Sequence, residues 1–263
     1  MSPPTRGSKR PRSAASRDAR RLYGDLAWTW PIISPPEHYV EESEAFARLI
    51  RESSLTDPRA LLHLGCGGGH NDFTLKRHFD VTGVDVSPAM LRLARRLNPE
   101  VDYRLGDMRR VRLRRVFDAV AILDSINYML TEADLRAAFA TAFLHLRPEG
   151  VLLTYIEDEP RRFVQNRTKC LVGSEGGVEV TFVENDYDPD PRDTTFGSTF
   201  VFLIRRDGRL EVETDRHLCG IFPMRTWTSL LRATGFRVVR REELPASDPG
   251  EDVVPILVCR KPA

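Results

Sequence analysis

Short apolar runs alternate with amphipathic segments of helical period between residues 60 and 158. One run, FDAVAILDS at 117–125, is almost continuously apolar, as expected of a strand that is covered on both faces. Repeated strand–helix units of this kind predict an α/β fold built on a doubly wound, mostly parallel sheet. The predicted strands are 60–65, 81–86, 101–107, 117–125 and 151–158. The predicted helices are 71–78, 87–97 and one that is capped by Thr131 and stopped at Pro148–Gly150.

From about Thr168 to Gly220 the pattern changes to a period of two, which is typical of antiparallel strands. The chain then returns to a helical pattern and to two further apolar runs. We interpret residues 165–220 as an antiparallel β subdomain inserted into a single domain of residues 21–263. The predicted elements of this part are strands 177–188, 198–206 and 210–220, a helix at 222–235, and strands 236–244 and 253–261.

The N-terminal part of the chain divides into three segments. Residues 1–20 are rich in Arg, Ser and Pro without periodicity, which predicts a disordered basic tail. Residues 22–30, LYGDLAWTW, are aromatic. A proline-started segment follows, whose apolar positions recur at helical spacing up to Ile50 and predict a helix.

The composition is that of an ordinary soluble globular protein, with 41% hydrophobic and 29% charged residues. A formal charge of +1 gives no global field toward nucleic acid or anionic membrane. No apolar run has the length of a membrane span, and the four cysteines are scattered, so we expect a cytoplasmic protein with reduced thiols. The acidic run ENDYDPDPRDTT lacks the glycine and terminal glutamate of a calcium loop and is interpreted as a turn, so no metal is expected.

The glycine-rich stretch LGCGGGHN follows the first predicted strand and precedes a helix. Glycines at such a turn let the backbone approach a ligand closely. A phosphate-binding loop would need Lys and Ser or Thr after its last glycine, but His70 and Asn71 follow here. A dinucleotide loop would need a sixth-position glycine. The spacing of Gly65, Gly67 and Gly69 suits a smaller ligand that lies across the turn.

Residues that follow the other strands complete a pocket for a nucleoside with a polar tail. Asp85 ends the second strand, where a carboxylate can accept hydrogen bonds from both ribose hydroxyls. Met90, one turn into the next helix, is placed to cover an adenine face. Asp107 and Met108 offer a carboxylate to an exocyclic amine and backbone to a ring nitrogen. Residues 123–125 end the fourth strand beside the glycine turn.

The segments LLHLGCGGG, GVDVSPAMLRLAR, LGDM and FDAVAILDSINYML resemble the successive motifs of class I S-adenosylmethionine-dependent methyltransferases of the small-molecule type. The resemblance covers residues 60–155 and continues through RTWTSLLRATGFRVV. It implies a Rossmann-like fold with a seven-stranded sheet, S-adenosylmethionine as cofactor, and methyl transfer as activity. The cofactor-binding residues that it implies are Tyr23, His63, Gly65, Gly67, Gly69, Asp85, Ser87, Met90, Asp107, Met108, Leu123 and Asp124.

His63 departs from this family pattern, because members usually carry Asp or Glu at that position to reach the cofactor's ammonium group. A neutral imidazole can accept one hydrogen bond but supplies no counter-charge. Two readings stay open: either His63 contacts the cofactor, with Asp124 supplying the missing charge, or it is a structural residue hydrogen-bonded within the strand.

Candidate acceptor-side residues come from three segments. Tyr23, Trp28 and Trp30 lie where similar enzymes carry a lid, so aromatic faces there could contact the sulfonium or the substrate; core packing is the alternative. Asn127 and Tyr128 follow the fourth strand and are candidate substrate contacts, with turn packing as the alternative. His217 is a candidate general base together with Tyr128, although a lone histidine is more often structural.

The acceptor class follows from motifs that are missing. The Asn/Asp-Pro-Pro-aromatic run of nucleic-acid amino-methyltransferases is replaced by DSINY, and the paired glutamates of protein arginine methyltransferases are absent. We therefore expect a small-molecule acceptor. The insertion resembles that of enzymes that methylate sugar amines in bacterial secondary metabolism, and it often supports oligomerisation there. The alternatives are O-methylation, a cofactor-binding protein without transferase activity, and an RNA modifier guided by the basic tail.

Overall fold

The computed structural model describes residues 20–245 and 253–263. The predicted disordered tail therefore lies outside the described residues, apart from Arg20. Within the described ranges, no helix is long and apolar enough to cross a membrane.

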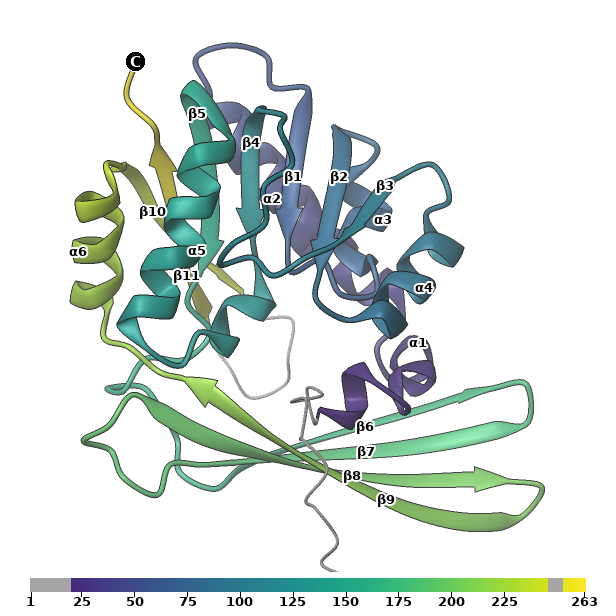
Figure 1. Cartoon of the computed structure of the whole chain (residues 1–263). Helices are drawn as coiled ribbons and strands as arrows, with labels where there is room; N and C mark the ends of the chain where they lie inside the picture. Colours follow the sequence, from purple (N-terminus) through teal and green to yellow (C-terminus); the bar gives the residue numbers. More distant parts are fainter. Residues whose placement is uncertain (1–19, 246–252) are drawn as a thin grey trace, which may run out of the picture.

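Seven strands form one sheet in the order β10-β11-β5-β4-β1-β2-β3, and β11 runs antiparallel to both of its neighbours (Figure 1). The predicted doubly wound, mostly parallel sheet is thus confirmed. Its strands are β1 (Ala60–Leu64), β2 (Asp80–Asp85), β3 (Asp102–Leu105), β4 (Phe117–Ile122), β5 (Leu146–Tyr155), β10 (Arg237–Pro245) and β11 (Val253–Arg260).

Helices cover both faces of this sheet, which is why its central strands are apolar on both sides. Along β1, Leu61 packs with one buried cluster while Leu62 and Leu64 pack with another. The first cluster lies under α2 (Val40–Ser53), α3 (His70–Leu75) and α4 (Pro88–Leu97). The second lies under α5 (Glu132–His145) and α6 (Met224–Thr234), on the opposite face (Figure 1).

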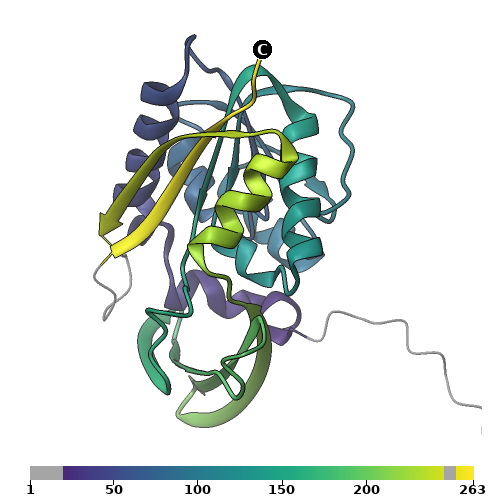
Figure 2. The same ribbon diagram turned by 90° about the vertical axis from the view of Figure 1, so that its left-hand side faces the viewer.

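A second, antiparallel sheet lies below the carboxyl ends of the parallel strands, and it is strongly curved (Figure 2). Three of its four strands coincide with runs that the alternating pattern predicts. The fourth, β6, has Gly173 and Ser174 in place of alternating apolar residues, so the pattern there is weak. The strands are β6 (Arg167–Glu175), β7 (Val178–Tyr187), β8 (Thr195–Arg206) and β9 (Arg209–Gly220).

The N-terminal segment packs between the two sheets. It consists of three short 3-10 turns and a one-turn helix: η1 (Arg21–Tyr23), η2 (Ala27–Thr29), α1 (Trp30–Ile33) and η3 (Pro36–Tyr39). Leu22 and Leu26 are buried against phenylalanines of the second sheet's inner face. At Gly173 the α1 backbone comes so close that a Cβ would lie 1.9 Å from the Ile32 carbonyl oxygen. This segment thus joins the second sheet to the first.

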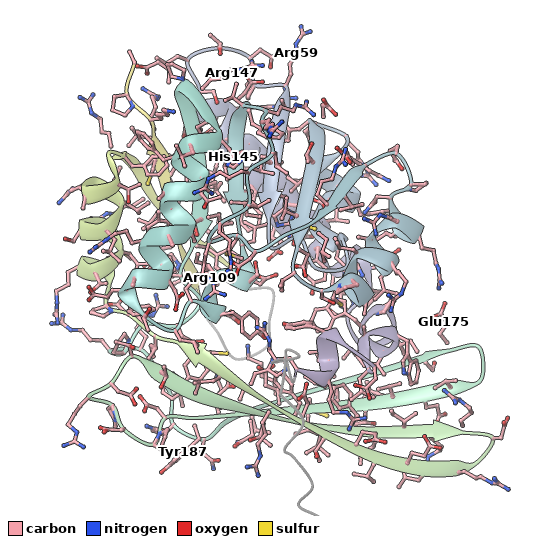
Figure 3. The ribbon with its side chains drawn as sticks, viewed as in Figure 1. Arg59, Arg109, His145, Arg147, Glu175 and Tyr187 are labelled. Atoms are coloured by element: carbon pink, nitrogen blue, oxygen red, sulfur yellow. The ribbon has the colours of Figure 1, made fainter. Side chains whose placement is uncertain are left out.

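One predicted boundary is wrong. The helix predicted from Thr131 to a stop at Pro148–Gly150 already ends at His145, and β5, predicted to begin at residue 151, begins at Leu146, which pairs with Phe117 of β4. The reason is local: Pro148 cannot continue a helix and its ring restricts Arg147 to extended backbone. His145 and Arg147 accordingly lie on two different elements (Figure 3).

Candidate active site

A cavity of about 1300 Å³ lies between the two sheets. Its walls come from the glycine turn, the carboxyl ends of the parallel strands, the N-terminal segment and the inner face of the second sheet. Pockets for a single small molecule usually hold about 300–1,000 Å³. The cavity therefore has room for two small molecules side by side.

The glycines of the turn serve two different purposes. Gly65, Gly67 and Gly69 all have positive φ, at 76°, 52° and 77°. A Cβ at Gly65 or Gly69 would collide with the protein, 1.8 Å from Ser125 Oγ and 2.5 Å from Tyr103 Oη respectively. A Cβ at Gly67 would meet only the Met90 methyl, at 3.7 Å, and Gly67 borders the cavity. Gly67 therefore leaves space for a ligand, whereas the other two allow close packing.

Asp85 stands at the end of β2 and faces the cavity. One carboxylate oxygen accepts a hydrogen bond from Gly67 N at 2.9 Å and the other from Ser87 N at 2.7 Å. Burial raises the pKa of this carboxyl group. Both oxygens keep further lone pairs, so the side chain can still accept hydrogen bonds from a ligand.

Ser87 and Met90 connect this carboxylate to the N-terminal segment. The Ser87 hydroxyl accepts from Met90 N, which caps α4, and donates to the Tyr23 carbonyl oxygen at 2.5 Å. Met90 packs in a small cluster with Ala27, where Tyr23 and Trp30 also pack. Ser87 and Met90 both border the cavity.

Asp107 and Met108 border the cavity after β3. Burial works against ionisation of Asp107, but hydrogen bonds from Arg109 outweigh it and lower the pKa of the carboxyl group to about 2. Arg109 also donates to Asp134 of α5 at 2.7 Å, and its side chain lies near the lower end of that helix (Figure 3). The Asp107 carboxylate is thus an ionised acceptor held in a fixed position.

His63 does not border the cavity. It is 1% exposed, and its Nδ1 lies 2.7 Å from one oxygen of the fully buried Asp72. The other Asp72 oxygen accepts a hydrogen bond from the Tyr103 hydroxyl at 2.9 Å. Burial lowers the pKa of His63, but the Asp72 carboxylate has the opposite effect and the net shift is upward. This corrects the first reading: His63 has a structural role, and it is hydrogen-bonded to Asp72 of α3 rather than within its own strand.

The residues after β4 lie partly at the cavity wall. Leu123 is 1% exposed, and its carbonyl oxygen already accepts a hydrogen bond from Ile126 N at 3.0 Å. Asp124 and Ser125 border the cavity, and Ser125 Oγ donates to the Gly65 carbonyl oxygen. Of the three residues predicted beside the glycine turn, two can therefore meet a ligand with their side chains.

On the acceptor side, the structure brings Tyr23, Tyr128 and His217 together although they come from three distant parts of the chain. The two phenolic oxygens lie 2.8 Å apart, and the Tyr128 oxygen lies 2.7 Å from His217 Nδ1. The other ring nitrogen of His217 lies 2.8 Å from Asp215. The alternation along β9 places His217 on the buried face and Arg216 on the exposed face. Sequence reasoning missed Asp215, although residues i and i+2 of a strand share a face.

The two other predicted substrate contacts differ in position. Asn127 borders the cavity and donates a 2.5 Å hydrogen bond to Glu157, which borders it too. Trp28 is not at the cavity wall, which corrects that prediction: it is 36% exposed, and the Arg206 guanidinium of β8 lies over its ring. Its place in the wall is taken by Trp30.

Two further residues of the wall had only weak sequence signals. His70 stacks on Trp30, and burial lowers its pKa to about 4, so it is neutral at pH 7. Arg167 of β6 forms ion pairs with Asp158 and Asp186.

In the loop after β7, Asp190 pairs with Arg192. Among residues 20–245 and 253–263, no three His, Cys, Asp or Glu side chains converge on a metal position.

Comparisons with known proteins agree with this geometry. A family model described as a methyltransferase domain matches residues 61–150. The Streptomyces venezuelae enzyme dTDP-3-amino-3,4,6-trideoxy-alpha-D-glucopyranose N,N-dimethyltransferase is 30% identical over 212 residues, which cover 79% of this chain and 87% of that enzyme.

Solved structures cover more of the chain. The crystal structure of Streptomyces venezuelae DesVI has a TM-score of 0.75 at 26% identity and covers 91% of this chain and 96% of its own. S-adenosylmethionine-bound CalS10, an amino pentose methyltransferase from Micromonospora echinaspora, has a TM-score of 0.72 at 27% identity and covers 85% and 91%. Both likenesses extend well beyond residues 61–150.

Proposed function

Since the chain belongs to the class I S-adenosylmethionine-dependent methyltransferases, we propose that it methylates an amino group of a small, sugar-like molecule. Two of the proteins named above are by name methyltransferases of amino sugars: the dTDP-amino sugar N,N-dimethyltransferase and the amino pentose methyltransferase CalS10. The N-methylation reading is therefore favoured over O-methylation.

The cofactor side of the cavity fits S-adenosylmethionine, which supplies an electrophilic methyl group when it is bound. A Cβ at Gly67 would project into the open space beside Met90, so the turn forms a cradle that only glycine leaves open. Asp85 would hold the ribose hydroxyls, with Gly65 and Gly67 along the methionine side; the predicted contact of Gly69 is not retained, because Gly69 packs against Tyr103 away from the cavity wall. Met90, Met108 and Asp107 would hold the adenine. Tyr23, Ser87 and Asp124 complete the proposed set.

One observation carries the proposal: a single cavity joins this cradle to Asn127 and Tyr128, and His217 lies directly behind Tyr128. An amine that carries a proton at pH 7 cannot attack a methyl group, so a nearby base is useful. We assign that role to His217 acting with Tyr128. Asn127 and Glu157 form the adjoining wall for the acceptor.

Calorimetric titration with S-adenosylhomocysteine tests the cofactor assignment. We expect micromolar binding that Asp85→Ala weakens about 10- to 100-fold, because hydrogen bonds to a charged group contribute ~1.5–3 kcal/mol. Asp102→Ala serves as control, since this exposed carboxylate lies on β3 and pairs with the neighbouring Arg104. Absence of binding by the folded wild type would overturn the assignment. An acceptor screen that pairs amino sugars with their hydroxy counterparts then separates N- from O-methylation.

Self-association through the second sheet belongs to the same proposal. The face that points away from the cavity exposes Val172, Tyr187, Val212 and Leu218, at 73%, 53%, 58% and 51%. Tyr187 lies on this outer side in Figure 3. An apolar sheet face of this kind favours a second copy as partner. Light scattering should give a dimer mass, and Val212→Glu should shift it toward the monomer; a monomeric wild type would contradict this.

A cytosolic location is the last part of the proposal. It is supported by the four cysteines, all of which are free thiols, as expected of a reducing compartment.

A further inference from the structure

The hydrogen-bonded chain behind the acceptor wall contains two groups to which the proposed function gives no role: the Asp215 carboxylate and the Tyr23 hydroxyl. We propose that Tyr23, Tyr128, His217 and Asp215 form one proton relay, in which Tyr23 takes the proton from the acceptor's ammonium group and Asp215 fixes the direction of transfer. This inference rests on the proposed function, because it presumes an amine acceptor.

Asp215 sets the tautomer of His217. An ionised carboxylate can only accept hydrogen bonds, so the His217 nitrogen that lies 2.8 Å from Asp215 must carry a proton. In the neutral imidazole the other nitrogen, Nδ1, is then an acceptor. Since Nδ1 lies 2.7 Å from the Tyr128 oxygen, Tyr128 donates its proton to it.

The same argument continues one step outward. Tyr128 has one proton and uses it toward His217, so in the 2.8 Å contact between the phenols Tyr23 is the donor. The Tyr23 oxygen then has no proton left, and its lone pairs are free to accept a hydrogen bond. Tyr23 borders the cavity. The group that the chain presents to a ligand is therefore an acceptor, which suits an ammonium group and does not suit a carbonyl.

The two ends of the hydrogen-bonded relay differ in how deeply they are buried. Tyr23 and Tyr128 are half-buried at the cavity wall, whereas His217 is 3% and Asp215 6% exposed. The phenols thus give a substrate proton a path from the cavity wall to the buried imidazole. Burial also raises the pKa of both phenols, so they stay protonated at neutral pH. They pass a proton on rather than act as bases themselves.

Hydrogen bonds from neighbouring residues hold the members of the relay in position. Asp215 accepts two more hydrogen bonds, from Leu22 N and from Arg216 N, each at 2.8 Å. The first of these fixes the residue before Tyr23. Because Ser87 holds the Tyr23 carbonyl from the cofactor side, the Tyr23 segment is fixed from both sides of the cavity. Asp215 is therefore a positioning residue for His217 and for Tyr23.

Other charged and titratable groups face the phenols from each neighbouring element. Arg20 lies over the Tyr128 ring, with its guanidinium carbon 4.2 Å from the centroid. Asp124 of η4 (Asp124–Tyr128) acts on Tyr23 through space, whereas Cys219 of β9 is a neutral thiol, because burial raises its pKa. The Phe200 ring packs against His217 at 4.5 Å. The positive charge of Arg20 opposes a proton held on the phenols and thus favours its transfer inward.

The proposed step is balanced as follows. One ammonium proton passes to the Tyr23 oxygen, the Tyr23 proton moves to Tyr128, and the Tyr128 proton moves to His217 Nδ1. The electron pair left on nitrogen forms the new N–C bond to the methyl carbon while the S–C bond breaks and its electrons stay on sulfur. His217 becomes an imidazolium beside the Asp215 carboxylate, and the proton returns to solvent along the same chain after product release.

Paired acceptors test the relay on the full-length protein. An alkylamine acceptor is charged at pH 7 and needs the relay, whereas an aromatic amine of similar size is neutral and does not. We expect Tyr128→Phe and Asp215→Asn to lower kcat for the alkylamine by about 10²–10⁴-fold at pH 7, the usual range for a lost general base. The loss should shrink as the pH rises through the amine's own pKa. With the aromatic amine, kcat should change less than about 3-fold.

Controls separate the alternatives. Asp190→Asn, in the exposed loop after β7, should behave as the wild type with both acceptors, and S-adenosylhomocysteine titration shows that each variant still folds and binds. Equal losses with the two acceptors, or no loss with either, would overturn the relay. A wild type that methylates neither amine would instead overturn the proposed function, and the relay would fall with it. If Asp215→Asn does not fold, Tyr128→Phe alone decides.

Discussion

Two buried His–Asp pairs lie on opposite sides of the cavity, and they differ in what the second imidazole nitrogen meets. In the first, His63 lies 2.7 Å from Asp72 beneath the glycine turn; in the second, His217 lies 2.8 Å from Asp215 on the second sheet. Both histidines are at most 3% exposed. Nε2 of His63 has no hydrogen-bond partner, whereas Nδ1 of His217 meets Tyr128 at the cavity wall.

This difference shows that the pair itself does not decide its role. A proton moves only along a continuous chain of donors and acceptors, and the chain from His63 leads away from the cavity. Through Asp72 it reaches Tyr103, whose hydroxyl contacts Asn98, and Asn98 donates to the Gly69 carbonyl oxygen. The first pair therefore holds the glycine turn in shape, and the second can exchange a proton with a ligand.

The largest effect is expected from removing the carboxylate of the first pair. Asp72→Ala leaves His63 and the Tyr103 hydroxyl buried without their partner, so the free energy of unfolding should fall by about 3–5 kcal/mol. Urea denaturation measures this, with the exposed Asp102→Ala as control. A loss below about 1 kcal/mol would mean that Asp72 does not anchor the turn, and the contrast between the pairs would disappear.

Two substitutions in the glycine turn separate an effect on stability from an effect on ligand binding. Gly69→Ala combines a left-handed backbone, which costs ~1–2 kcal/mol, with a collision against Tyr103 and Asn98, which costs ~1–3 kcal/mol more. Gly67→Ala has the backbone cost alone, but its Cβ enters the cavity. Thermal unfolding should therefore show that Gly69→Ala is the less stable of the two variants. Titration should show that Gly67→Ala loses more affinity for S-adenosylhomocysteine, relative to its loss of stability, than Gly69→Ala does. The reverse ranking would contradict the assignment.

Much of the first sheet could be predicted from sequence, because its strands are apolar runs and its loops carry short motifs. Gly67, Asp85 and Met90 belong to such motifs and do border the cavity. The relay could not be predicted as a unit. Its members lie at 23, 128, 215 and 217, and no local pattern records that β9 passes η1 and η4.

His63 illustrates the opposite failure. Its position in the motif left both a ligand contact and a structural role open, and the residue that decides between them is Asp72, on the following helix. Helical geometry places Asp72 on the buried face of α3, and only the packing of β3 brings Tyr103 to it. Position within a motif therefore predicts where a backbone lies better than it predicts where a side chain points.

Each His–Asp pair contacts one tyrosine, and replacing that tyrosine by phenylalanine gives a matched comparison with a smaller expected effect. Tyr103→Phe removes the donor to the buried Asp72 and the acceptor of Asn98, so it should cost about 1–3 kcal/mol of stability. Tyr128→Phe removes a hydroxyl at the cavity wall, where the Tyr23 hydroxyl can donate to water or ligand instead, and should cost less. Denaturation of both variants measures the difference. Equal costs would show that the two networks are equally structural.

The smallest effect concerns the pH dependence of stability. The pKa of His63 is raised in the folded state, so its contribution is fully present below the unfolded value of about 6.5 and is lost as the pH rises through the folded pKa. The melting temperature should therefore decline above pH 6.5, by ~2–4 °C for each kcal/mol lost. His63→Gln should flatten this decline. His78→Gln is the matched control, because the pair of His78 with Glu44 is partly exposed and contributes little. An unchanged slope in His63→Gln would show that the charge of the first pair does not change with pH, and that Asp72 is held by Tyr103 alone.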